Sequence, residues 1–298
     1  MPKQADNLAK LPSAVDLPPV SGVAKPRRAR TGVVHAVRQS LGNPRKALAI
    51  GLIEAIYAIQ RLWRRDWIFV DPEVPSRSFT LWKLSRLAGI RLVGLDALSE
   101  RPKAPPPLAR FRHRDVTWDE AADQAQINGG CLDISKSRVD REFALAFGYA
   151  SAIDPTAHHG VAVCKSEING THSGELVMCP LPPEQLKADH IYQRLVSNEV
   201  APGIVSEYRV AILGYRAVFA LETRRDIDQR LAGRGQGGRG STPKPVEAVF
   251  STEDRSRIET FCRGLGLEAG ELDILPDRDE NRIYILDANK TPTTVTST

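Results

Sequence analysis

Residues 271 to 292 combine two apolar segments with side chains that carry metal-binding oxygen atoms. The pattern predicts a β-hairpin, and successive side chains of a strand point to opposite faces. We therefore expect Asp287 and Asn289 on one face of the second strand, together with Ile285, and antiparallel pairing can bring Asp273 beside Asp287. Carboxylates inside apolar strands are costly unless a cation or hydrogen bonds compensate them. Two carboxylates and an amide oxygen suit Mg²⁺ held with a nucleotide phosphate, and the alternative is a surface hairpin whose polar residues face water.

A lysine near the middle of the chain is placed to bind phosphate. Lys165 ends a β-branched segment and leads into a polar turn that contains Gly170 and Gly174. Mobile glycines let backbone N–H groups approach an anion closely, and the neighbouring lysine adds positive charge. The spacing of a Walker loop does not occur in the chain, which excludes the P-loop class of nucleotide site. A plain hairpin turn is the other interpretation of these residues.

The elements that would position these residues alternate between helices and hairpins. Helices are expected over residues 33–65, 78–88, 137–147 and 254–264. Strands are expected over residues 67–70, 90–94, 160–165, 175–178, 207–213 and 217–221, with a basic, glycine-rich loop over residues 224–242. The first strands and the helix between them predict a small β-α-β unit. The alternation, without an internal repeat, predicts an α+β fold.

Composition divides the chain into three parts. Residues 1–32, rich in proline, alanine and arginine, are expected to be a disordered basic arm. Residues 33–114 are expected to hold an N-terminal helix and a small α/β domain, and residues 115–298 the main domain.

Positive charge is concentrated at the beginning of the chain. The 298 residues include 41 lysines and arginines against 36 aspartates and glutamates, a formal net charge of +5. Residues 1–65 alone hold twelve basic residues against three acidic ones, so the remainder is mildly acidic. A basic arm can bind nucleic acid or anionic lipid, and it can equally be a solvated tail.

The most apolar stretch, Ala47 to Trp63, is interrupted by Glu54 and Gln60 and is short for a bilayer span, so no transmembrane segment is predicted. The arginines at its end also suit a helix that lies on a membrane surface, while packing onto the body of the protein is the simpler interpretation. The four cysteines show no metal-ligand spacing and no signal peptide precedes them. We therefore expect reduced thiols in a cytoplasmic protein without zinc.

The order of these features along the chain resembles the ATP-grasp superfamily. Within it, the chain resembles the ligase-like branch that contains D-alanine–D-alanine ligases and ribosomal-protein glutamate ligases. The likeness extends over about residues 130 to 295. It is carried by residues 163–174, with the lysine and glycine loop, by residues 206–214, and by the hairpin of residues 271–292, which we call the metal hairpin. The resemblance implies an ATP-grasp fold, in which two α+β subdomains clasp ATP, preceded by the small β-α-β domain. The small subdomain would be residues 115–189, with the loop of Lys165, and the large subdomain residues 190–298, with the metal hairpin.

The resemblance also implies roles for individual residues. The phosphates of ATP would be contacted by Lys136 and Lys165, with Gly170 and Gly174 in the loop. His172 in this loop could assist, and a solvent-exposed turn histidine is the alternative interpretation. The adenine-binding hinge would be Tyr192, Gln193, Arg194 and Leu195, and Glu207 would approach the ribose. Mg²⁺, with Mn²⁺ as an alternative metal, would be held by Asp273, Asp287 and Asn289. Arg209, Arg224 and Arg225 would offset charge on the phosphates or on an acyl-phosphate intermediate.

The chain departs from the family's pattern at several positions. Gln193 stands where a glutamate is common at the hinge, and Asp287 replaces a more usual glutamate. No glycine follows Pro292, and the stretch over residues 224–240 is longer and richer in glycine and arginine than in the family. Residues 233–240 within it also resemble an RNA-binding arginine–glycine segment, and a mobile active-site lid is the alternative.

These features predict a ligase that uses ATP and Mg²⁺ to activate a carboxylate as an acyl phosphate, which an amine or similar nucleophile then attacks to form a C–N bond. The substrate would be a small-molecule or peptide carboxylate, which a likeness of fold does not identify. One alternative is a phosphotransferase acting on a hydroxyl group. The other is a non-catalytic protein that binds nucleotide or nucleic acid through the basic arm and residues 233–240. The oligomeric state is left open by the sequence.

Overall fold

The computed structural model describes residues 44–97, 105–120, 123–171, 174–231 and 238–293. The expected disorder of residues 1–32, the roles given to residues 233–237 and the candidate His172 lie outside these residues. By its internal contacts the chain divides into two units, residues 1–48 and 49–298. The elements described below belong to the second unit, apart from the beginning of one helix.

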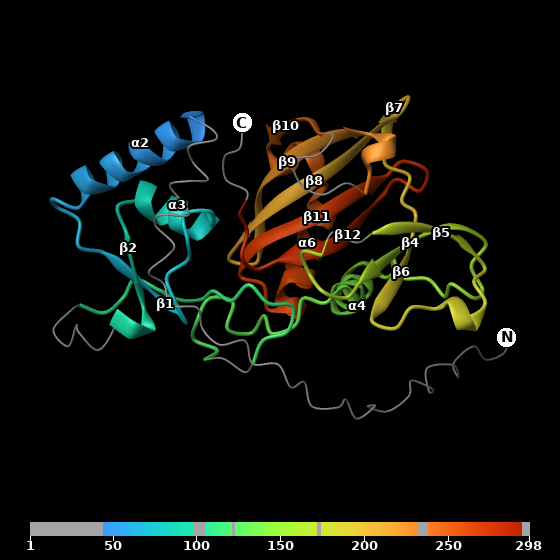
Figure 1. The fold of residues 1–298 in the computed structure, drawn as a ribbon, viewed down its shortest axis with the longest axis horizontal. Helices are drawn as coiled ribbons and strands as arrows, with labels where there is room; N and C mark the ends of the chain where they lie inside the picture. The colour runs from blue at the N-terminus through green and yellow to red at the C-terminus, as the bar shows by residue number, and fades with distance from the viewer. Residues whose placement is uncertain (1–43, 98–104, 121–122, 172–173, 232–237, 294–298) are drawn as a thin grey trace. The chain divides into compact units, whose positions relative to one another are not determined.

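A small parallel sheet forms the first part of the second unit (Figure 1). Strand β1 (Trp67–Asp71) pairs in parallel with β2 (Arg91–Gly94), and helix α3 (Thr80–Leu87) connects the two strands. Strand β3 (Arg110–Arg112) pairs in parallel with the other side of β1. Helix α2 (Pro44–Gln60) precedes the sheet, and a 3-10 turn, η1 (Leu95–Ala97), follows β2. The buried side chains of Trp67, Phe69 and Val93 pack together in its core. The predicted β-α-β unit is confirmed, although its preceding helix ends at Gln60 rather than near residue 65.

A second, antiparallel sheet carries the lysine-bearing loop. Its strand order is β5 (Glu175–Cys179), β4 (Gly160–Ser166) and β6 (His190–Arg194), with η2 (Pro183–Gln185) between β5 and β6. Helix α4 (Lys136–Phe147) precedes it, capped by the Ser135 side chain at its start and by Gly148, with φ of 81°, at its end. Val139 and Phe143 on this helix are fully buried, as their spacing by four residues predicts.

The largest sheet is antiparallel and holds the metal hairpin. Its order is β10 (Gly238–Lys244), β9 (Arg216–Asp226), β8 (Ile204–Leu213), β11 (Ala269–Asp277) and β12 (Arg282–Asn289), and β7 (Glu199–Ala201) also pairs with β8. Between strands lie η3 (Ile227–Gln229), α5 (Val246–Val249) and α6 (Thr252–Leu265). The prediction of a loop over residues 224–242 is wrong at both ends, because β9 extends to Asp226 and β10 pairs with it from Gly238. The mixed architecture confirms the α+β class.

The two faces of this sheet differ in character because strand side chains alternate. Val210, Ile212, Leu272 and Ile274 point to one face and form a buried core with α4 and α6. The residues between them point to the opposite face, which carries the polar side chains of the candidate site. Alternation thus places the core and the site on two sides of the same strands.

A β-bulge changes the predicted orientation of the metal hairpin. Asp273 pairs with Asp287, but the next residue, Ile274, pairs with Ile285, so Leu286 is an additional residue on β12. Asp287 and Ile285 therefore lie on opposite faces. The prediction that they share a face is wrong, because it assumed strict alternation through the bulge.

Candidate functional site

One face of the largest sheet carries a row of charged side chains across three strands. Asp287 on β12 lies opposite Asp273 on β11, which lies opposite Arg209 on β8. The Arg209 guanidinium donates to both carboxylate oxygens of Asp273, at 2.8 and 3.1 Å, and its Nε lies 3.8 Å from Glu271. Burial alone would lower the pKa of Arg209, but Asp273 and Glu271 raise it. The predicted proximity of the two aspartates is confirmed by this register.

Glu207 and Arg225 extend the row along β8 and β9. The register of these strands puts both on the face of Arg209, and Arg225 donates a hydrogen bond to Glu207. Arg224 points to the opposite face, where its Nε donates to Glu222 at 3.0 Å. Of the three predicted arginines, the structure brings Arg209 and Arg225 together and leaves Arg224 apart from them.

Two lysines from neighbouring elements complete the charged face. Lys136 is the first residue of α4 and is buried, and its Nζ donates to the backbone oxygen of Ile168 at 3.3 Å. Lys165 lies at the end of β4 within the electrostatic influence of Asp287, Lys136 and Asp273. Burial lowers the pKa of Lys165, although the two aspartates oppose this change. Burial raises the pKa of Asp287, and the two lysines oppose that change in turn.

The loop between β4 and β5 is bound to the start of α4. Glu167 accepts a hydrogen bond from the backbone N–H of Ser137 at 2.9 Å and another from its hydroxyl group. Gly170 has a φ of 75°, in the left-handed region that favours glycine. Gly174 lies beside the lysine, since a Cβ placed there would be 3.8 Å from Cγ of Lys165. The predicted lysine and glycines are therefore parts of one local structure.

The predicted hinge contains polar groups that face no protein partner among the described residues. Gln193 is 1% exposed and donates to the Ser151 hydroxyl at 2.9 Å, while its Oε1 has no hydrogen-bond partner within those ranges. Leu195 follows β6 directly, after the pair that Arg194 makes with Ala162 of β4. The buried acceptor of Gln193 without a partner is suited to a donor group on the edge of a purine base.

The other two hinge residues have side chains engaged elsewhere. The Tyr192 hydroxyl accepts a hydrogen bond from the backbone N–H of Lys187 at 2.9 Å. Arg194 binds the turn of the metal hairpin, where it donates to Glu280 at 2.7 and 3.2 Å and to the Tyr284 hydroxyl at 2.7 Å. Arg194 therefore joins the second sheet to the largest one, and a role in the hinge would fall to its backbone.

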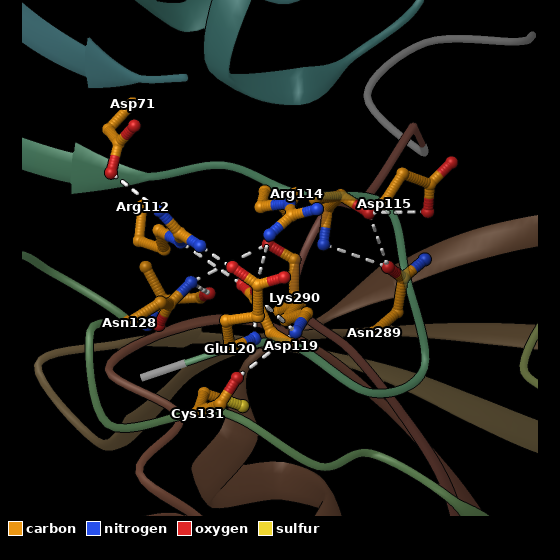
Figure 2. A network of polar contacts seen from close by, with 12 residues as sticks. Asp71, Arg112, Arg114, Asp115, Asp119, Glu120, Asn128, Cys131, Asn289 and Lys290 are labelled. Atoms are coloured by element: carbon orange, nitrogen blue, oxygen red, sulfur yellow. Dashed lines mark hydrogen bonds and ion pairs between the residues drawn. The ribbon is translucent and has the colours of Figure 1, made fainter. Parts of the chain in front are cut away.

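The end of β12 is fixed by the polar network shown in Figure 2. The amide oxygen of Asn289 accepts a hydrogen bond from the backbone N–H of Thr291 at 2.9 Å. The Thr291 hydroxyl in turn donates to Asp115 at 2.8 Å. The Thr291 hydroxyl also lies 3.4 Å from the Asn289 oxygen, so Thr291 fixes the orientation of this candidate metal ligand.

A buried ion cluster lies beside this segment and centres on Asp119, whose side chain is 1% exposed (Figure 2). Arg112 donates to it at 2.8 and 3.1 Å and also reaches Asp71 at 2.6 Å. Arg114 donates to Asp119 at 2.8 Å, and the Lys290 ammonium lies 3.9 Å away. Burial would raise the pKa of Asp119, but Arg112 and Lys290 hold it below its usual value. The cluster connects the end of the parallel sheet to the residue that follows Asn289.

Sequence reasoning missed this cluster and also Glu271. The alternation of Arg110, Arg112 and Arg114 is visible in the sequence, as is a lysine next to Asn289. Nothing local indicates that these cations share Asp119, because the pairing depends on the approach of segments distant in sequence.

The donor set fits a metal held jointly with a nucleotide. Within the described ranges, no group of three or more His, Cys, Asp or Glu side chains is arranged to hold a metal ion. Mg²⁺ is usually bound by one or two carboxylates, together with water and substrate phosphates. The pair Asp273 and Asp287, with the Asn289 amide oxygen, meets this requirement, and the lysines opposite them fit the phosphates.

Comparisons with known proteins give likeness of structure only. No protein-family model matches the chain, and no curated protein matches it. The chain is similar to the ATP-grasp ligase PsnB complexed with its minimal precursor, at 14% identity over 76% of this chain and 90% of that one, with a TM-score of 0.48. It is also similar to D-alanine–D-alanine ligase from Bacillus anthracis, at 9% identity over 78% and 88%, with a TM-score of 0.47. A third similar structure is the macrocyclase MdnC from Microcystis aeruginosa bound with its precursor peptide, at 14% identity over 76% and 70%, with a TM-score of 0.35.

Proposed function

We propose that this protein is an ATP- and Mg²⁺-dependent ligase of the ATP-grasp type, which activates a carboxylate for attack by an amine. The observation that carries the proposal is the convergence of Lys136, Lys165, Asp273 and Asp287 from α4, β4, β11 and β12. Lys136 is buried, Lys165 and Asp287 are half-buried, and the Asp273 side chain is 40% exposed, so two cations and two carboxylates meet where a ligand that uses both can reach them. A metal–triphosphate complex is such a ligand, since its phosphates need cations and its metal needs oxygen atoms.

The residues divide the binding of this complex between them. Lys136 and Lys165 would bind phosphate oxygens, with the backbone of the loop at Gly170 closing over them. Asp273 and Asp287 would hold Mg²⁺ with the amide oxygen of Asn289, which Thr291 orients. When bound, Mg²⁺ would neutralise charge on the phosphates as the terminal phosphorus is attacked.

The remaining polar groups would orient the nucleotide and the transferred group. The open Oε1 of Gln193, together with the backbone of the hinge, would receive the adenine edge. Glu207 would approach the ribose, although it is engaged by Arg225 in the structure. Arg209 and Arg225 would offset negative charge on the phosphoryl group during its transfer. Arg224 is left out of the proposed site, because its side chain points to the other face of the sheet.

A trapping assay tests the proposal directly. The protein is incubated with Mg-ATP, hydroxylamine and a panel of amino acids and peptides, and ADP and hydroxamate are measured. An acyl phosphate reacts with hydroxylamine, so a ligase releases ADP only with a carboxylate and yields the hydroxamate of that carboxylate. Lys165→Met should abolish both products. Lys187→Met should not, because Lys187 is an exposed lysine that precedes β6 and pairs with Glu175.

Other outcomes would overturn the proposal. ADP release that depends on a hydroxyl compound and leaves a stable phosphate ester would assign a phosphotransferase instead. Binding of Mg-ATP without turnover over the whole panel would favour a non-catalytic nucleotide-binding protein. Equal activity of Lys165→Met and the wild type would contradict the assigned site whatever the reaction.

A further inference from the structure

The part of helix α2 within the second unit, with the turn that continues it, presents its apolar side chains to solvent. Leu52, Ile59, Leu62 and Trp63 are 61, 56, 80 and 65% exposed. Their spacing is that of one side of a helix. We call these four residues the outer face of α2. Four large apolar side chains side by side are more than the scattered single residues that ordinary surfaces expose.

The inner side of the same helix mixes apolar and polar side chains and binds the protein, with Ile53 and Ile56 half-buried there. Glu54 pairs with Arg77 at 3.3 Å and with Arg86 at 3.9 Å. The guanidinium of Arg86 also lies 3.9 Å from the centre of the Tyr57 ring, and Gln60 donates to the backbone oxygen of Leu87 at 3.0 Å. A surface helix normally buries its apolar stripe and exposes its polar one. Helix α2 carries apolar side chains on both sides, so the burial of its inner side does not account for the apolar outer face.

The charges around the outer face indicate what covers it. Arg64 and Arg65 follow Trp63 and are exposed, and the guanidinium of Arg64 donates to the backbone oxygen of Ala88 at 3.2 Å. Within residues 49–65, three arginines stand against a single acidic residue, Glu54. Leucine and tryptophan on one side, with arginines at the rim, are typical of helices that lie in the headgroup layer of an anionic bilayer. None of the helices in the described residues is long and apolar enough to cross a membrane.

We propose that the outer face of α2 binds the surface of membranes that contain anionic phospholipids. Its apolar side chains would enter the boundary between headgroups and acyl chains, and Arg65 would contact lipid phosphates. The ion pairs of Glu54 would keep the helix attached to the small parallel sheet. This binding is independent of the proposed ligase activity, since it uses none of the residues of the nucleotide site.

Vesicle sedimentation of the full chain tests the proposal. The protein is mixed with vesicles of phosphatidylcholine alone or of phosphatidylcholine with phosphatidylglycerol, and the bound fraction is measured. We expect binding to the anionic vesicles, weakened by salt, and a loss of more than about tenfold in the double variant Leu52→Glu with Ile59→Glu. The matched control is Leu213→Glu with Val218→Glu, which changes two exposed apolar residues of the β8–β9 hairpin in the same way. The control should bind as the wild type does.

Two further measurements separate the proposal from its rivals. Arg65→Gln should weaken binding without affecting the thermal melting temperature, which confirms that the fold is intact. Binding of the α2 double variant at the wild-type level would assign the lipid contact to the basic arm and overturn the proposal. Absence of binding to anionic vesicles would also overturn it. A concentration-dependent dimer that the same double variant abolishes would assign the outer face to a second copy of the chain.

Discussion

Replacing Asp119 by asparagine tests how the ion cluster supports the site. The substitution Asp119→Asn would keep the shape of the side chain but remove the negative charge that Arg112, Arg114 and Lys290 share. Because the Asp119 carboxylate is 1% exposed and the Lys290 side chain is 2% exposed, water cannot replace the lost charge without rearrangement. The cluster would be left with three cations, of which Arg112 would still pair with Asp71.

The expected loss of stability is large. Removing one partner of a buried ion pair costs about 3–5 kcal/mol. Each kcal/mol lowers the melting temperature by about 2–4 °C in domains of roughly this size, so a fall of about 6–20 °C follows. Asp123→Asn is the matched control, because Asp123 pairs with Arg110 at 3.1 Å with side chains 44 and 48% exposed. An exposed pair contributes about 0–1 kcal/mol, so the control should melt within a few degrees of the wild type.

Thermal melting followed by circular dichroism measures both variants, and chemical denaturation supplies the free energies. Lys290→Met should also destabilise the protein, and the double variant should lose less than the sum of the single losses, because the two residues interact. If Asp119→Asn melted at the temperature of Asp123→Asn, the cluster would not have the structural role that its burial indicates.

The remaining predictions concern single positions. Lys165→Met should weaken Mg-ATP binding at least about tenfold by calorimetry, equal to about 1.4 kcal/mol, while Lys187→Met should leave the affinity unchanged. An equal loss of affinity in both variants would refute the assignment of Lys165. Burial lowers the pKa of His113 in the folded state. Below about pH 6.5 the unfolded state therefore binds a proton that the folded state does not bind, and the free energy of unfolding falls as the pH falls. His113→Gln should flatten this decline between about pH 7 and 5.5, and an unchanged slope would contradict it. Gly266→Ala should lower the melting temperature, because Gly266 has φ of 73° and a Cβ there would lie 2.6 Å from the backbone of Gly130. An unchanged melting temperature would show that the backbone moves to accommodate the Cβ.

Local patterns were sufficient for most of the elements. The hairpin of β11 and β12, the β-α-β unit and the capped helix α4 follow from apolar spacing and from glycine positions within short segments. The pairing of Asp273 with Asp287 follows in the same way, since a hairpin fixes its own register. The bulge at Leu286 could not be predicted from the sequence, because a bulge adds a residue to one strand without a clear signal in an apolar run.

The site was predicted less completely than the fold. Lys136 and Lys165 were assigned through a resemblance of order along the chain, and their shared position opposite Asp287 depends on how β4 and α4 approach β12. Arg224 and Arg225 are neighbours in sequence, and only the register of β9 determines which of them faces the site. The contact of Asp119 with Lys290 joins segments far apart in the chain, and no local pattern indicates it.

Titration calorimetry with Mg-ATP tests the central claim most directly, because the claim is that the face between Lys165 and Asp287 binds a metal–nucleotide complex. We expect the wild type to bind Mg-ATP and to bind ATP with EDTA much more weakly. Asp287→Asn should lose at least about tenfold in affinity, and Asp279→Asn, an exposed carboxylate in the turn of the same hairpin, should bind as the wild type does. Absence of Mg-ATP binding by the wild type, or equal affinity in the two variants, would contradict the account.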